Sequence, residues 1–430
     1  MHRPNSAPTA LLIEEHGFLT TPGACAATLP LSAATDMLAT WRRKPKTRPA
    51  FLRLPHLDEE REKARLWSRR FREQSRRLIV LGIGGSSLGG NMLVAALAPN
   101  GWAVTFYDNI CPEFLASLYD TDWEDVTVLA VSKSGETAET LAQFLTVLPV
   151  MRARLGPRYR AHAAVITENP NGDLAVIARD AEIPIIEHPA VGGRFSALSV
   201  VGLLPAVFAG ADIDSLLAGA STMAEECLRP HPQENPALRY ALAQAGMFRA
   251  GRNLTVIMAY GQRLEKITSW FRQLWAESLG KRDQAGGPQG LTPVDGRGVT
   301  DQHSQLQLYL DGPPDKQFTL LHDPGLATMG ATIPGDSFHH LPAVAPLAGR
   351  TIGELFAAEF LGTRDALIHR GAPVRVLSLA AADPYALGEM ILLLEMETVL
   401  VAELLGVTPF DQPAVEDGKR RARTYLQSMT

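Results

Sequence analysis

The stretch "LGIGGSSLGG", residues 81–90, decides the fold because it lies where a strand gives way to a helix. Its glycines and serines present backbone N–H groups and hydroxyls, which bind phosphate at helix N-termini. Gly82 and Gly84 match the first two glycines of the dinucleotide-binding pattern, but Ser87 stands at the third, and no G-K-[ST] sequence of a P-loop follows. The stretch therefore predicts a phosphate-binding turn without a nucleotide fingerprint. A tight turn that binds nothing is the alternative.

A second turn of the same kind is "VSKSGETAET", residues 131–140. Ser132, Ser134 and Thr137 place three hydroxyls around the expected helix start. Their alternative role is to cap the orphan amides of that helix. In an open parallel sheet, ligands bind beyond the carboxyl ends of the strands, so two such turns are expected to close on one phosphate.

Strand-like and helix-like stretches alternate along most of the chain. The expected strands of the first set are 77–84, 102–108, 126–134, 161–169 and 183–189, and those of the second are 253–260, 317–323 and 373–379. Helices are expected near 264–279, 352–361 and 384–405. Alternation of this kind predicts an α/β fold of two tandem α-β-α sandwiches with mainly parallel sheets, plus a C-terminal helix.

The expected domain organisation follows from that alternation. Residues 1–50 form an N-terminal extension, interpreted as a loosely packed lead-in with one helix, and 51–224 form the first domain, which carries the phosphate-binding turns. Residues 225–410 form the second domain, and 411–430 form a helix that returns to the active site.

Composition limits the class of protein. The 430 residues are 46% hydrophobic and 20% charged, with a net charge of −5, so no overall positive field attracts nucleic acid. The three cysteines, Cys25, Cys111 and Cys227, indicate a reducing compartment without a disulfide framework. We find no secretory or membrane-spanning pattern and expect a cytoplasmic protein.

The two turns and three further motifs, in this order, resemble the glucose-6-phosphate isomerase family of the bacterial type. The further motifs are "VGGRFSALSVVGLLP" from Val191, "QLWAESLGK" from Gln273 and "VTDQHSQLQLYLDGP" from Val299. The resemblance covers roughly residues 75–425. It implies two sugar-isomerase (SIS) domains, a cytoplasmic homodimer, a sugar-phosphate substrate, no cofactor and no metal. One departure is Glu136, where a hydroxyl residue is expected beside the phosphate.

The resemblance also assigns roles at the reacting carbons. Glu277 is four residues after Gln273 on the same helix, so the two share a face. The family makes Glu277 the base and Gln273 a substrate contact. From spacing alone, a solvent-exposed pair of Glu277 with Lys281 is favoured. By resemblance Arg194 steadies the negative enediolate, which suits its permanent charge; an ordinary salt bridge is the alternative.

The ring-opening groups come from two other motifs. By resemblance His303 opens the sugar ring and is supplied by the neighbouring subunit; an ordinary surface or core histidine is the alternative. Lys419 is seven residues after Gln412 in "FDQPAVEDGKRRA". The resemblance makes Lys419 a second ring-opening residue and Gln412 a contact at the phosphate end, whereas a frayed basic tail is the alternative. The expected substrate-binding residues of the turns are Gly85, Ser86, Ser132, Lys133, Ser134 and Thr137.

The reaction implied by the resemblance is the reversible conversion of D-glucose 6-phosphate to D-fructose 6-phosphate through a cis-enediol, in glycolysis and gluconeogenesis. One alternative is an isomerase for a related sugar phosphate, for example with dual glucose and mannose 6-phosphate activity. Another is a non-catalytic SIS protein that senses a phosphosugar, which has no reason to keep a Glu, a His and a Lys in these motifs. Ser87 disfavours a third alternative, an NAD-dependent dehydrogenase.

Overall fold

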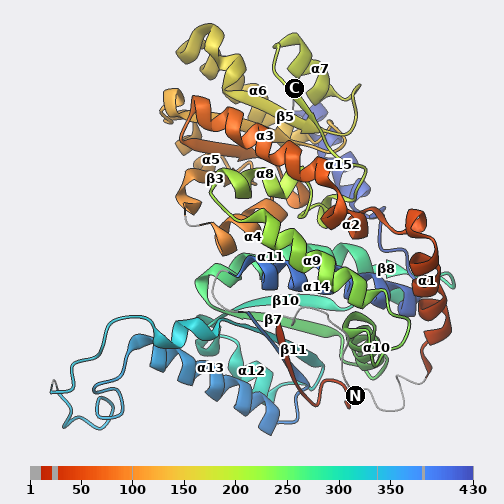
Figure 1. Ribbon diagram of the computed structural model, residues 1–430, viewed down its shortest axis with the longest axis vertical. Coiled ribbons are helices and arrows are strands. Elements are labelled where there is room, and N and C mark those ends of the chain that lie inside the picture. Colours follow the sequence, from red (N-terminus) through yellow and green to blue (C-terminus); the bar gives the residue numbers. More distant parts are fainter. Residues whose placement is uncertain (1–10, 22–27, 99, 337, 380–382, 430) are drawn as a thin grey trace.

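The computed structural model describes residues 11–21, 28–98, 100–336, 338–379 and 383–429. It contains two five-stranded sheets, one above the other in Figure 1, with helices between and around them. Cys25 lies outside the described residues, and Cys111 and Cys227 are free. The expected pair of α-β-α sandwiches is confirmed.

The first sheet has the order β3-β2-β4-β5-β6, and every pairing in it is parallel. The side chains of its central strands are buried on both faces: Leu78 and Val80 join one core cluster, while Ile79 and Leu81 join another. Strands covered on both faces are continuously apolar, which explains why the sequence marks them clearly. The strands are β2 (Arg77–Leu81), β3 (Val104–Tyr107), β4 (Val126–Val131), β5 (Ala163–Thr167) and β6 (Ile185–Glu187).

Helices cover both faces of this sheet (Figure 1). They are α2 (Ala50–Arg53), α3 (Asp58–Gln74), α4 (Leu88–Leu97), α5 (Pro112–Tyr119), α6 (Ala138–Leu155), α7 (Asp173–Asp180) and α8 (Val200–Phe208).

The second sheet has the order β1-β12-β11-β7-β10, parallel except for β1 at the edge. The sequence predicted β7, β11 and β12 but missed β10, whose proline and glycines disguise it. The strands are β1 (Leu12–His16), β7 (Leu254–Tyr260), β10 (Thr292–Gly298), β11 (Lys316–His322) and β12 (Val374–Ser378), and β8 (Lys281–Arg282) and β9 (Pro288–Gln289) form a separate pair.

The helices of the second half pack around and between the sheets. They are α9 (Ile213–Cys227), α10 (Pro236–Arg249), α11 (Glu265–Leu279), α12 (Leu306–Asp311), α13 (Ile352–His369) and α14 (Pro384–Leu405). Helix α14 packs against α9, α10 and α11 in the layer between the sheets, so it is buried almost all round (Figure 1). Among the described residues, no helix is long and apolar enough to cross a membrane.

The N-terminal segment corrects an expectation. Residues 12–16 are not a loosely packed lead-in, because β1 pairs antiparallel with β12 along its whole length. Leu11 and Phe18, which flank the strand, are buried. The strand "LIEEH" lacks an apolar alternation, since it lies at a sheet edge with both glutamates exposed, and this hid it from the sequence pattern. The one helix expected in this region is α1 (Leu31–Arg43).

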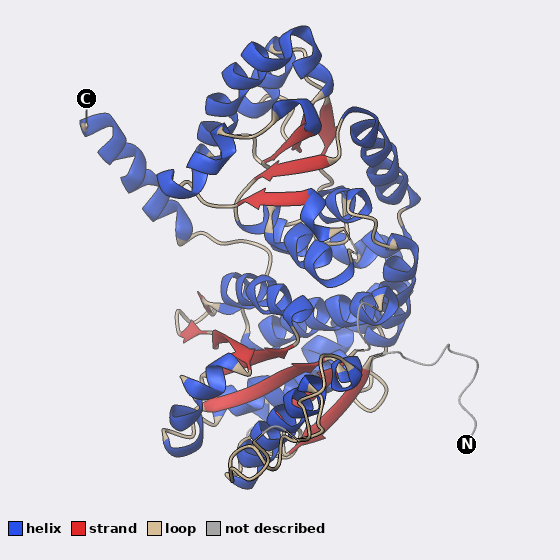
Figure 2. Cartoon of the chain, turned by 90° about the vertical axis from the view of Figure 1, so that its left-hand side faces the viewer, coloured by secondary structure: helices blue, strands red, loops and turns tan. Residues whose placement is uncertain are grey.

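The predicted domain limits stay a prediction. Helix α9 crosses the limit placed at residue 224 and packs on α14. The C-terminal helix α15 (Val415–Ser428) begins slightly later than expected, and all of its residues are exposed. In Figure 2 it projects from the body of the molecule.

Candidate active site

The two predicted phosphate-binding turns lie side by side. They follow β2 and β4, which are neighbours in the first sheet, and they open α4 and α6. A Cβ atom added to Gly82 would lie 3.2 Å from the carbonyl oxygen of Val131, which places the two turns in contact. Two helix N-termini therefore face the same region, as the sequence predicted, and both carry the partial positive charge that favours an anion.

The three hydroxyls of the second turn differ in their hydrogen-bond partners. Ser134 Oγ accepts the backbone N–H of Glu136, so its alternative role of satisfying a local amide is realised. Thr137 is the N-cap of α6 but makes no side-chain capping bond; its Oγ1 lies 2.9 Å from Ser132 Oγ. Ser132 Oγ also accepts the N–H of Gly135. The Glu136 side chain, which departs from the expected pattern, is exposed.

Lys133 is turned toward the next strand. Its Nζ lies 3.2 Å from Glu168 Oε2, just after β5, so its charge is paired in this structure. Ser86 lies in the first turn and is partly buried.

Gly85 explains why the first turn is glycine-rich. A Cβ atom there would come within 2.3–2.7 Å of the backbone of Gly193. Gly193 begins the short 3₁₀ turn Gly193–Phe195, which carries Arg194. Only glycine permits this approach, and it brings the "GGRF" motif directly against the predicted phosphate-binding turn.

Helix α11 brings Gln273 and Glu277 to the same place. A Cβ atom on Gly84 would lie 2.9 Å from Gln273 Nε2, and Gly84 has a φ of +59°, which also favours glycine. Gln273 Nε2 donates to Glu277 Oε1 at 3.0 Å. The helix therefore joins the predicted phosphate-binding turn to the carboxylate of Glu277, whose side chain is 31% exposed. The predicted shared face of these two residues is confirmed.

Arg194 is buried beside that carboxylate. Its Nε donates to Ser278 Oγ at 2.8 Å, and its Nη1 donates to Glu277 Oε2 at 3.3 Å and to Gln412 Oε1 at 3.0 Å. Its Nη2 donates to the carbonyl oxygens of Pro409 and Asp411. Burial lowers the pKa of the guanidinium, and Glu277 is the largest opposing influence.

A cleft of about 880 Å³ opens next to Glu277. The end of α11, the β8–β9 pair and the segment 408–415 line it. Lys281 lies in this cleft and donates to Asp411 Oδ1 at 2.6 Å and to the carbonyl oxygens of Thr408 and Asp411. Burial lowers the pKa of Lys281, while its hydrogen bond lowers the pKa of Asp411. The pair of Glu277 with Lys281 that spacing favoured is therefore wrong.

His303 and Lys419 do not join these residues within the chain. His303 ends the 3₁₀ turn Thr300–His303, which follows the carboxyl end of β10, and it is exposed. Glu277 lies at the other end of the sheet, because α11 begins beside Arg297 and ends beside Gly290. Lys419 Nζ lies 2.7 Å from Glu416 Oε1, three residues before it on exposed α15. The structure brings Gln412 to the site, but not the helix that follows.

Comparison with known proteins identifies the family at this point. The family model described as "Phosphoglucose isomerase" matches residues 58–312. The chain belongs to the phosphoglucose isomerase family. It is 38% identical to a glucose-6-phosphate isomerase of Carboxydothermus hydrogenoformans, over 91% of this chain and 88% of that one. It is 40% identical to that of Rubrobacter xylanophilus, over 86% of this chain and 88% of the relative.

Solved structures agree with this membership. A hypothetical protein from Thermus thermophilus superposes with a TM-score of 0.83 at 36% identity, covering 96% of this chain and all of that chain (100%). A glucose-6-phosphate isomerase from Chlamydia trachomatis gives a TM-score of 0.78 at 20% identity, covering 98% and 89%. The second likeness supports the fold of the family.

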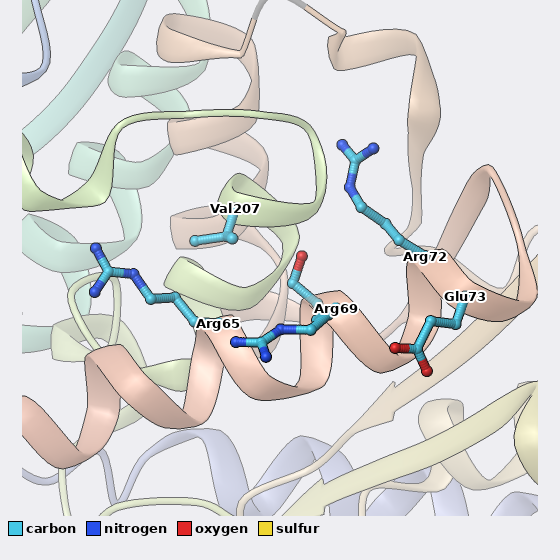
Figure 3. A pocket seen from close by; sticks show the side chains of 6 residues that line it. Arg65, Arg69, Arg72, Glu73 and Val207 are labelled. Atoms are coloured by element: carbon cyan, nitrogen blue, oxygen red, sulfur yellow. The ribbon is translucent and has the colours of Figure 1, made fainter.

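Another hollow, of about 460 Å³, lies along α3 (Figure 3). Three arginines line it, but two of them hold neighbouring elements: Arg65 pairs with Asp214, and Arg72 donates to the carbonyl oxygen of Phe208. None of the predicted site residues lines this hollow. In the described part of the chain, no group of three or more His, Cys, Asp or Glu residues is placed to hold a metal ion. The absence of a metal or cofactor in the working enzyme stays a prediction.

Proposed function

We propose that this protein interconverts D-glucose 6-phosphate and D-fructose 6-phosphate, the reaction for which its relatives are named. The observation that carries the proposal is the chain of contacts from the phosphate turn at Gly84, through Gln273, to the carboxylate of Glu277 with Arg194 beside it. A phosphorylated sugar requires an anion site and a base within reach of one molecule, and these contacts support that arrangement.

In the proposed mechanism, the phosphate binds at the N-termini of α4 and α6, near Ser132 and Thr137. Glu277 removes the proton from C2 of the open-chain aldose, and electrons move toward the C1 carbonyl to give a cis-enediol. The protonated carboxyl then returns the proton to C1, and the hydroxyl on C2 gives up its proton to the oxygen on C1, so that the carbonyl forms at C2 and a hydroxyl remains on C1. Arg194 lies close enough to Glu277 for its fixed charge to stabilise the enediolate.

The position of His303 supports a site shared between two chains. Strand β10 spans Thr292–Gly298, and a strand rises about 3.3 Å per residue, so the two ends of this sheet are separated by roughly 20 Å. His303 lies beyond one end, and Glu277 lies near the other. We infer that His303 opens the ring in the site of a partner subunit, in a homodimer related by a two-fold axis.

Like His303, Lys419 does not contact Glu277 within its own chain. Its helix is exposed along its whole length, yet it follows directly after Gln412, which contacts Arg194. We infer that α15 brings Lys419 to a sugar ring when the substrate is bound or the partner subunit is present. A cytoplasmic location belongs to this proposal as well.

A coupled assay tests the activity. Purified protein supplied with fructose 6-phosphate should form glucose 6-phosphate, and prolonged chelation should not abolish turnover. Activity that is lost on chelation and restored by metal would contradict the cofactor-free reaction. Turnover of mannose 6-phosphate as well would support the dual isomerase. Binding of a hexose phosphate without turnover would leave the sensing protein as the better function.

A further inference from the structure

The segment 408–412 is held by two cations from distant parts of the chain, the buried Arg194 and the mostly buried Lys281. Arg194, from the first half of the chain, donates to the carbonyl oxygens of Pro409 and Asp411. Lys281, just after α11, donates to the carbonyl oxygens of Thr408 and Asp411 and to the Asp411 carboxylate. The carbonyl oxygen of Asp411 is thus shared by both cations. The segment is the connection between buried α14 and exposed α15.

Lys281 has no donor left for a substrate. An ammonium group has three N–H donors, and the three acceptors of the segment use them all. Its side chain is only 11% exposed, although it lies in the cleft beside Glu277. These contacts suit a group that holds the segment better than one that binds the sugar.

Arg194 connects the segment 408–412 to the proposed base, Glu277. Gln412, the next residue after Asp411, accepts from the same Nη1 atom that donates to Glu277. The Asp411 side chain is 61% exposed and is fixed by Lys281. If Lys281 were removed, this carboxylate would be free to pair with Arg194 in competition with Glu277.

We propose that Lys281 is a positioning residue for the isomerisation: it fixes the segment 408–412 so that Arg194 and Gln412 stay in place beside Glu277. This inference rests on the proposed function, and it adds a residue that the sequence analysis treated only as a solvent-exposed partner of Glu277 and to which the comparisons give no role.

The test uses Lys281→Met in the full-length protein, with Lys266→Met as the matched control. Lys266 is an exposed lysine at the start of the same helix. Loss of charge-assisted hydrogen bonds at Lys281 should lower kcat by about 10–100-fold. Hydrogen exchange at the backbone amides of Thr408, Phe410, Asp411 and Gln412 should become measurably faster. Lys281→Arg should restore part of kcat and part of the slow exchange, and Lys266→Met should change neither kcat nor the exchange rate.

A double-mutant cycle with Gln412→Ala separates positioning from a general structural effect. If Lys281 acts through this segment, the loss of kcat in the double variant will be clearly smaller than the product of the two single losses. Losses that multiply, or unchanged exchange at 408–412, would overturn the proposal. If Lys281→Met does not fold, Asp411→Asn gives the same two measurements. An inactive wild type would refute the proposed function alone, because the exchange measurement needs no activity.

Discussion

Two neighbouring side chains orient the carboxylate of Glu277. Its partners in the structure are Gln273, one helical turn earlier, and Arg194, which is 83 positions away in the sequence. The amide orients one carboxylate oxygen, and the guanidinium faces the other. Arg194 uses all five of its donors on protein acceptors, so its contribution to the enediolate in this arrangement is the field of its charge.

The first prediction concerns Glu277→Gln, which preserves the shape of the side chain and removes the base. General base catalysis typically contributes about 10²–10⁴ in rate, so kcat should fall by at least 100-fold. The same change at Glu265, at the other end of α11, is the control and should leave kcat close to that of the wild type. A Glu277→Gln enzyme that retained more than about a tenth of wild-type kcat would show that another group is the base.

The second prediction concerns the phosphate turn. Ser132→Ala and Thr137→Ala remove hydroxyls expected to bind phosphate in the substrate and in the transition state alike, so the main effect should be on KM. A charge-assisted hydrogen bond contributes roughly 1.5–3 kcal/mol, so KM should rise about tenfold or more. Thr146→Ala, an exposed position on the same helix, is the control. Unchanged affinity of both variants for inorganic phosphate would mean that the phosphate binds elsewhere.

At the scale of elements, β1 ties the N-terminal segment to the second sheet. Phe18, just after this strand, is fully buried, with its ring edge-on to Tyr240 at 5.9 Å and below the guanidinium of Arg375 at 5.1 Å. Arg375 is itself buried and paired with Glu397 at 2.8 Å. An aromatic ring lies over this buried ion pair, and the segment that supplies the ring is therefore part of a hydrophobic cluster with helix α10.

The third prediction follows from that packing. Phe18→Ala removes a large buried side chain and should lower the free energy of unfolding by about 3–5 kcal/mol. Leu12→Ala, on the same strand but 61% exposed, should change it by less than about 0.5 kcal/mol. Urea unfolding followed by circular dichroism measures both. Equal unfolding midpoints for the two variants would mean that β1 contributes little to the stability of the second sheet.

At the scale of the whole molecule, one chain does not assemble all of the predicted catalytic residues. Glu277, Arg194 and Gln412 meet in one place, whereas His303 lies near the opposite end of the second sheet. A second chain related by two-fold symmetry is the arrangement that we propose to complete the site. In such a dimer each subunit gives one residue and receives one.

The fourth prediction tests this exchange with a heterodimer of a Glu277→Gln chain and a His303→Ala chain. One of its sites then carries both changes, and the other carries neither. Random pairing makes about half of the dimers mixed, so the mixture should regain roughly a quarter of wild-type activity. Subunits must be exchanged by co-expression or by refolding, and the substrate must be mainly cyclic. Verified heterodimers no more active than the mean of their parents would place His303 in its own chain's site or outside catalysis.

The sequence by itself determined the features that depend on neighbouring residues. Continuous apolar runs marked the strands of the first sheet, because both faces of those strands are covered. Glycine and hydroxyl residues marked the two turns, and a four-residue spacing placed Gln273 and Glu277 on one helix face. The motif order also indicated the family, and the comparisons confirm it.

The tertiary structure alone decided the contacts between distant segments. The pairing of β1 with β12, the placement of Gln412 against Arg194 and the choice of Asp411 as the partner of Lys281 join residues far apart in the chain. The spacing of apolar and polar residues along the sequence does not predict such contacts. An edge strand needs no apolar alternation, and a lysine can pair with any acid within reach. Arg194 and Lys281 lie 217 and 130 positions before Asp411, and both donate to its carbonyl oxygen, because only packing of the folded chain brings such distant residues together.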